Sequence, residues 1–196
     1  MISPKHPFWL VGFRPFFSLA CIAGLSLPIL WILILKGVLP APSAAYSPTQ
    51  WHAHEMFYGF GWAVLGGFLL TSTKNWVNVR GYHGSVLIYL TLTWLVERGV
   101  MAFGGHLPPL LFWLGSQLFL LSMVGLLLAT LIHHRNTDNY RRDNLFFLLI
   151  LPTFAVAKIL ILLPDSFQIG WTMTLGLFRV AFLVMPERTL PPFMKS

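Results

Sequence analysis

Charged side chains are scarce in this sequence. Only 10% of its 196 residues are Asp, Glu, Lys or Arg, and six of these are acidic. A water-soluble domain carries about 25% charged residues, so the composition excludes an ordinary soluble enzyme. The hydrophobic share is 56% and the mean hydropathy is +0.71. The chain is therefore predicted to be an integral membrane protein.

Cysteine is nearly absent as well. The single Cys21 excludes a disulfide framework and a C-x-x-C-H site for covalent haem attachment, and it is expected to be a small buried hydrophobic residue. The sequence also lacks a Gly-rich phosphate loop, a G-x-S-x-G motif and an H-E-x-x-H motif. Phosphoryl transfer and hydrolase chemistry therefore have no support.

Long apolar runs dominate what is present. They are continuous over about 20 residues instead of alternating with period two, which favours membrane-spanning helices over a β-barrel. Six such helices are expected, at about 16–35, 48–72, 85–103, 109–132, 145–163 and 169–185. We predict an all-α, polytopic helix bundle that forms a single transmembrane domain over residues 1–196.

The basic residues indicate how the chain is oriented. They fall at the two termini and in the loops after the even-numbered helices, whereas the alternate loops, 37–50, 104–108 and 164–168, contain none. This set comprises Lys5, Arg14, Lys74, Arg80, Arg135, Arg141, Arg142, Arg188 and Lys195. Because cytoplasmic loops carry the excess of Lys and Arg, both termini are predicted to be cytoplasmic. The net charge of +7 is attributed to this topology and not to nucleic-acid binding.

The segment Trp51–Met56, which reads W-H-A-H-E-M, places two imidazoles and a carboxylate at the start of an apolar stretch. Polar groups are costly there, and these residue types hold transition metals or haem iron. The alternative is an interfacial helix start whose His and Glu face water. The preceding S-P-T-Q has the form of a capping box, so the helix is expected to begin near Pro48 on the outer side.

The spacing of this segment separates its two imidazoles. On a regular helix His52 and His54 lie about 160° apart, and His52 and Glu55 about 60° apart. The two His residues therefore serve different sites, or only one of them is a ligand. His52 is expected to be the buried one, with Glu55 accepting its second ring N–H. His54 would then point toward a second site, a lipid headgroup or water.

A stripe of small residues lies on the expected face of His52. It consists of Gly59 and Ala63, flanked by Gly66 and Gly67. Small residues let another helix, or a flat ligand such as a porphyrin, approach the backbone closely. Both readings, plain helix packing and a cofactor face, remain open at this point.

Further polar residues fall at the same depth. Glu97 and Arg98 lie near the outer end of the third helix, His106 follows in the loop, and Lys158 lies near the outer end of the fifth helix. Arg98 is expected to pair with Glu55 or with an anionic ligand such as a haem propionate. Glu97 and Arg98 could alternatively form a structural ion pair with another helix. Lys158 is expected to snorkel to the outer interface.

These residues define the candidate sites. The candidate cofactor-binding residues are His52, His54, Glu55 and Arg98, and the candidate metal ligands are His52, His54 and His106. No residue is singled out as catalytic.

Two strings carry a resemblance to a known family. Residues 12–17 read G-F-R-P-F-F, and residues 51–56 read W-H-A-H-E-M, followed by G-F at 59–60 and G-F-L-L-T at 67–71. This sequence resembles the NnrS family over most of its length, from about Gly12 to about Asn144, and the likeness weakens afterward.

The resemblance implies a polytopic protein of the bacterial cytoplasmic (inner) membrane that contains haem and copper and helps bacteria to withstand nitric oxide. It makes His52 and His54 candidate ligands. Members of this family are commonly about twice as long, and they end in a G-R-V-I-P-F-F-type segment where this chain has E-R-T-L-P-P-F. The expected partners are therefore membrane lipid, nitric oxide or a related small ligand, and a second half or second copy that completes the site.

Three functions are compatible with these features. The first is a haem- or copper-binding membrane protein in nitric-oxide tolerance. The second is a redox enzyme of the quinol or nitric-oxide type, for which the chain offers only His52, His54 and His106 on one side. The third is a cofactor-free bundle or half-transporter that functions only as a dimer. Whether the protein is an enzyme stays open.

Overall fold

The computed structural model describes residues 3–40, 42, 46–138, 140, 142 and 144–194, with side chains as far as residue 187. Within this part of the chain six helices are long and apolar enough to cross a membrane, which confirms the predicted all-α bundle. The helices are α1 (Phe13–Leu35), α2 (Pro48–His54), α3 (Trp62–Trp76), α4 (Ser85–Phe103), α5 (Pro109–His133), α6 (Leu145–Leu162) and α7 (Phe167–Met194). Short 3₁₀ segments lie at η1 (Pro7–Trp9), η3 (Gly104–His106), η4 (Arg135–Thr137) and η5 (Pro164–Ser166).

The second membrane span is assembled from three consecutive segments. α2 continues into a π-helical segment, η2 (Glu55–Gly61), and then into α3, so that Pro48–Trp76 forms one span. The predicted capping box is present. Ser47 Oγ accepts from the Gln50 N–H at 3.2 Å, and the Gln50 side chain accepts from the Ser47 N–H at 2.8 Å. These bonds satisfy donors that a helix N-terminus leaves unpaired, so the span begins at Pro48.

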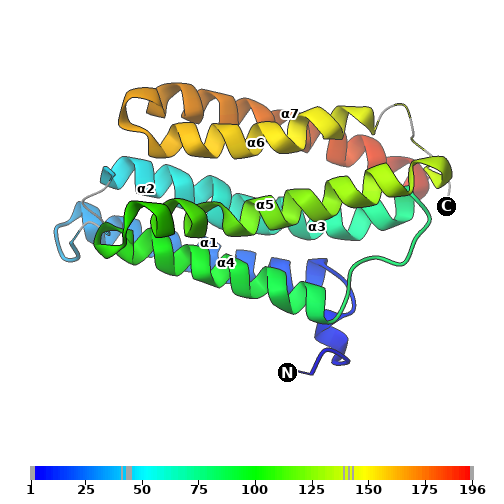
Figure 1. Cartoon of the computed structure of the whole chain (residues 1–196), viewed down its shortest axis with the longest axis horizontal. Helices are drawn as coiled ribbons and strands as arrows, with labels where there is room; N and C mark the ends of the chain where they lie inside the picture. The colour runs from blue at the N-terminus through cyan, green and yellow to red at the C-terminus, as the bar shows by residue number, and fades with distance from the viewer. Residues whose placement is uncertain are drawn as a thin grey trace.

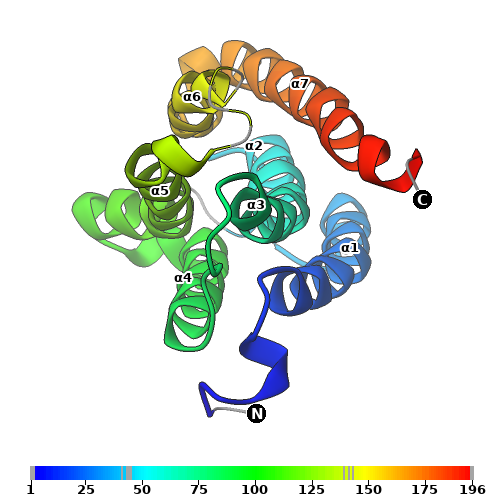
Figure 2. The ribbon, with the colours of Figure 1, turned by 90° about the vertical axis from the view of Figure 1, so that its right-hand side faces the viewer.

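This second span forms the centre of the bundle. Seen from the end in Figure 2, α3 is surrounded by α1, α4, α5 and the pair α6 and α7. Burial agrees with this position, because 56% of an 18-residue apolar stretch of this span is buried, against 17% of such a stretch in α1. Polar side chains on this span are therefore the ones most enclosed by protein.

The start of α1 and the end of α7 lie on the same side of the bundle (Figure 1). The assignment of that side to the cytoplasm stays a prediction from the distribution of Lys and Arg. Of the basic residues behind it, Arg141 and Lys195 and the side chain of Arg188 lie outside the described part of the chain.

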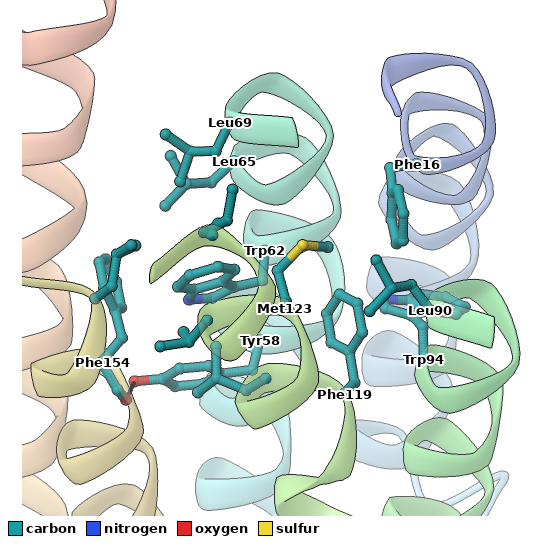
Figure 3. Close-up of a cluster of buried hydrophobic side chains, with 14 of the residues drawn as sticks. Phe16, Tyr58, Trp62, Leu65, Leu69, Leu90, Trp94, Phe119, Met123 and Phe154 are labelled. Atoms are coloured by element: carbon teal, nitrogen blue, oxygen red, sulfur yellow. Dashed lines mark hydrogen bonds between the residues drawn. The ribbon is translucent and has the colours of Figure 1, made fainter. Parts of the chain in front are cut away.

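The core is rich in aromatic rings. Figure 3 shows Tyr58 and Trp62 projecting from the second span toward Phe154 of α6, with Phe119 and Met123 of α5 on the other side. All five side chains are fully buried, and Trp62 meets Phe154 edge to face at 5.0 Å between ring centroids. Edge-to-face contacts are a preferred geometry for aromatic pairs. The core thus fixes how α5 and α6 pack on the central span.

The outward faces of the helices are apolar, as in Leu25, Leu110 and Leu183. Such faces suit a lipid surrounding, and the chain is an integral membrane protein. Cys21 is exposed on α1, so the expectation that it is buried was wrong. The reason is that most of α1 faces away from the bundle, and an apolar sequence alone does not tell a lipid-facing position from a core position.

Candidate functional site

Five ionisable side chains meet inside the membrane-spanning bundle. His54 and Glu55 come from the central span, Glu97 and Arg98 from α4, and Lys158 from α6; we call these five residues the ion cluster. The side chains of His54, Glu97 and Lys158 are fully buried, and those of Glu55 and Arg98 are 3% and 14% exposed. Ionisable residues at such a depth are costly, and they mark a functional site or a tightly paired structural one.

Glu97 lies at the centre of the ion cluster. Arg98 Nη2 donates to Glu97 Oε1 at 2.5 Å, and Lys158 Nζ forms an ion pair with Glu97 Oε2 at 2.8 Å. Arg98 also donates from Nη1 to Glu55 Oε2 at 3.0 Å. Two carboxylates therefore face two basic groups, and with a neutral imidazole the formal charge of the cluster is zero. This balance lowers the cost of keeping the charges away from water.

Of the two partners expected for Arg98, Glu55 or an anionic ligand, Glu55 is the one that Arg98 contacts in the structure. The expectation that Lys158 snorkels to the interface was wrong, since its ammonium reaches Glu97 and lies 5.4 Å from the centre of the Tyr58 ring. A long apolar stem allows either orientation, and a carboxylate within reach decides between them. The signal in the sequence was the equal number of acidic and basic residues at this depth.

The two imidazoles occupy different surroundings, but the expectation that His52 is the buried one was wrong. His54 is fully buried, and its Nδ1 lies 3.2 Å from Glu55 Oε1. His52 is half-buried and stacks on Trp31 of α1, with 4.3 Å between the ring centroids and 11° between their planes. Glu55 therefore orients His54 and not His52.

The π-helical segment accounts for this error. A π-helix has more residues per turn than an α-helix, because its hydrogen bonds join residues five apart, so it rotates the helix faces before and after it relative to one another. His54, Tyr58 and Trp62 share the inward face, and all three are fully buried. Counting from His52 in steps of seven and eleven assumes 3.6 residues per turn and assigns the wrong face.

The small-residue stripe is filled by protein. A Cβ at Gly59 would overlap the Arg98 guanidinium, while one at Gly66 would meet Met123 Cε at 2.8 Å and one at Gly67 would meet Phe16 Cβ at 2.8 Å. Of the two readings left open by the sequence, close packing is the one that the structure supports. Gly59 also accepts, at its carbonyl, the Trp94 indole N–H at 3.0 Å, which fixes α4 beside η2.

His106 is exposed in η3 and, unlike His54, does not belong to the ion cluster. Among the described residues no group of three or more His, Cys, Asp or Glu side chains is arranged to hold a metal ion. The structure therefore does not assemble His52, His54 and His106 into one metal site.

Sequence reasoning missed Tyr58 and Thr174. The Tyr58 hydroxyl donates to the Phe154 carbonyl at 3.0 Å and lies 2.9 Å from Thr174 Oγ1. These bonds connect η2 to α6 and α7 directly beside Lys158. The only available signal was a polar aromatic residue four positions after His54.

The sequence model of the NnrS family, described as NnrS protein, matches residues 7–196. This chain belongs to the NnrS family. The match reaches the end of the chain, farther than the motifs alone indicate. The comparisons with curated proteins and with solved structures gave no match.

NnrS resemblance implies haem and copper, and the residues can be compared with each group. His54 Nε2 is buried and has no hydrogen-bond partner among the described residues, and Glu97 Oε1 lies 3.9 Å from it. An unpaired imidazole nitrogen facing a carboxylate oxygen fits a metal ion such as copper. A porphyrin does not fit on the same helix face, because Arg98, Met123 and Phe16 fill the small-residue stripe.

Proposed function

We propose that this NnrS-family protein serves in nitric-oxide tolerance in the bacterial cytoplasmic membrane and binds copper or haem through the helix that carries His52 and His54. The observation that carries the proposal is the surroundings of the two ring nitrogens of His54. Its Nδ1 is directed to the Glu55 carboxylate, while its Nε2 is buried and finds no hydrogen-bond partner in the described part of the chain. Metal-ligating imidazoles are commonly oriented in this way, because a carboxylate on one nitrogen fixes the tautomer and leaves the other free to ligate.

A copper ion would be held by His54 Nε2 with the Glu97 carboxylate beside it. When bound, copper supplies a one-electron redox centre with affinity for small ligands such as nitric oxide. Glu55 orients the imidazole, and Arg98 and Lys158 compensate the two carboxylates. Two donors are fewer than copper prefers, so the ion would need further small ligands at this buried position.

Haem is assigned to His52. This imidazole lies half-buried and stacked on Trp31 of α1. His52 would supply an imidazole ligand to the haem iron, and without a C-x-x-C-H motif only coordination and packing would hold the porphyrin. Copper and haem would then be bound on different sides of the same helix.

One observation favours a second candidate, a cofactor-free bundle. Every charged group of the ion cluster has an oppositely charged partner within 3.0 Å, so the cluster is complete as a structural element. In that case His54 fills space beside Glu55, and Glu97 is needed only for stability.

Growth under nitric-oxide stress separates the two candidates. A nitric-oxide-sensitive bacterial strain that lacks its own family member would express the wild-type chain, His54→Ala, His52→Ala or the control His106→Ala at equal membrane levels. The proposal expects His54→Ala to lose protection while His106→Ala retains it. If His54→Ala protects as well as the wild type, the copper assignment fails and the cofactor-free candidate gains support.

A further inference from the structure

A cavity of about 260 Å³ lies at the opposite end of the bundle from the ion cluster. It is enclosed by the C-terminal end of α3, the α3–α4 loop and the C-terminal end of α5, the end that faces the viewer in Figure 2. Its apolar part includes Leu70 and Leu127, and its polar rim includes Lys74, Arg80 and His134. The cavity is slightly smaller than typical small-molecule pockets, which suits one compact polar group with an apolar attachment.

The loop that walls this cavity is held in place by specific bonds. Asn78 adopts a left-handed conformation, with φ of 55°, at the end of α3, and the Val79 N–H bonds back to the Lys74 carbonyl at 2.9 Å. This is the Schellman arrangement that closes a helix C-terminus. Thr137 of η4 fastens the same turn, because its hydroxyl donates to the Val77 carbonyl at 2.7 Å and its carbonyl accepts from Asn78 Nδ2 at 3.3 Å.

The position of Lys74 is also set by packing. Its aliphatic stem lies over Gly81, where an added Cβ would meet Lys74 Cδ at 2.7 Å. The lysine is therefore held along the cavity wall and not extended freely into water. A glycine at 81 gives the stem the space that it occupies.

The charge of the cavity is uncompensated. Among the described residues, its lining contains two basic side chains, Lys74 and Arg80, together with His134, and no carboxylate. Among the described residues neither Lys74 nor Arg80 forms an ion pair, in contrast with Arg98 and Lys158 of the ion cluster. Cations that line one cavity without a counter-charge form a site for an anion.

We propose that this cavity binds a phosphate group, carried either by an anionic phospholipid or by a soluble phosphate compound. Lys74 and Arg80 bind the phosphate oxygens, and His134 contributes a ring N–H. The apolar wall at Leu70 and Leu127 accommodates the attached carbon chain. Basic pockets between membrane helices bind anionic headgroups by this combination of charge and apolar contact.

The test compares two pairs of substitutions that remove the same charge from the same end of the bundle. Lys74→Gln with Arg80→Gln removes the cavity cations. Lys5→Gln with Arg142→Gln removes one exposed Lys and one exposed Arg that do not line the cavity. Each detergent-purified protein is mixed with phosphatidylglycerol, with phosphatidylcholine or with inorganic phosphate. Retained lipid is counted by native mass spectrometry, and phosphate binding by calorimetry.

The wild type and the Lys5/Arg142 pair are expected to retain phosphatidylglycerol over phosphatidylcholine, while the Lys74/Arg80 pair loses at least tenfold in affinity. Binding of inorganic phosphate with the same dependence on Lys74 and Arg80 would identify a soluble ligand instead, and would support the site. Gly81→Val, which displaces Lys74 without changing the charge, is expected to weaken binding as well. Equal losses in the two pairs, or equal binding by all proteins, would overturn the proposal.

Discussion

At the scale of single residues, Glu97 holds the ion cluster together. Of the carboxylates that the structure describes, it is the one that pairs with both Arg98 and Lys158, and it is fully buried. Its removal would leave an ammonium and part of a guanidinium inside an apolar bundle without their partner. The cost of breaking a buried pair comes mainly from that uncompensated charge and not from the lost contact itself.

Glu97→Ala is therefore expected to lower the free energy of unfolding by about 3–5 kcal/mol. The double variant Glu97→Leu with Lys158→Met is expected to lose less than Glu97→Ala, because it removes both charges together. Reversible unfolding in mixed detergent micelles measures these differences, with Thr91→Ala on the same helix as a control. The single variant Lys158→Met is measured as well. If the double variant is less stable than Glu97→Ala by the full loss measured for Lys158→Met alone, Glu97 and Lys158 do not stabilise each other, which would contradict the account.

Only part of this residue-level arrangement could be predicted. The Arg98–Glu55 pair followed from opposite charges at one depth on neighbouring spans. The burial of Lys158 did not, because a flexible lysine stem reaches either water or a buried carboxylate, and the sequence does not give the distance to Glu97. The choice between His52 and His54 depended on the local helix geometry and not on the residue types.

At the scale of secondary-structure elements, η2 decides which face of the central span meets α4 and α6. Its π-helical turns align His54 with Tyr58 and bring Gly59 beneath Arg98. π-Helical segments inside α-helices frequently occur at functional sites. The spans themselves were predictable from long apolar runs, Pro48 and Pro109 at helix starts, and the capping box. η2 was not predictable, because hydropathy has no signal for a wider turn.

Gly59 and Gly66 form a matched pair for testing which face of the central span meets α4. Both lie on the central span, but an Ala methyl at Gly59 would overlap the Arg98 guanidinium, whereas one at Gly66 meets the flexible end of Met123. Gly59→Ala is expected to destabilise the protein by about 2 kcal/mol or more, since it displaces a buried charge. Gly66→Ala is expected to cost less. Thermal unfolding followed by circular dichroism ranks the two, and the reverse ranking would show that Arg98 does not lie over Gly59.

Tyr58 links η2 to its neighbours through a single hydroxyl. Tyr58→Phe leaves the ring in place and removes the bonds to the Phe154 carbonyl and Thr174. The expected loss is about 1–3 kcal/mol, because a buried carbonyl and hydroxyl lose their partner. Thr174→Val removes one of the two bonds and is expected to cost less. The same unfolding measurement applies, and a neutral Tyr58→Phe would rule out this link.

At the scale of the whole molecule, six antiparallel spans place the ion cluster at one end of the bundle and the basic cavity at the other. The six-span architecture was predictable from composition and run length. The sidedness rests on Lys and Arg alone, and it assigns the ion cluster to the outer half of the membrane.

Cysteine labelling in intact cells tests this orientation. In a Cys21→Ser background, single cysteines at Lys5 and Asn136 report one side, and those at His106 and Asp165 report the other. A membrane-impermeant maleimide is expected to label His106→Cys and Asp165→Cys in whole cells, and Lys5→Cys and Asn136→Cys only after the cells are opened. The opposite pattern would place the ion cluster in the inner half.

The most direct test of the central claim is copper and haem content measured on detergent-purified protein by metal analysis and optical spectroscopy, for the wild type, His54→Ala and His106→Ala. The account predicts bound copper in the wild type and in His106→Ala, and its loss in His54→Ala, with the haem absorption unchanged. Copper that remains at the wild-type level in His54→Ala would contradict the assignment of His54 Nε2 as a ligand.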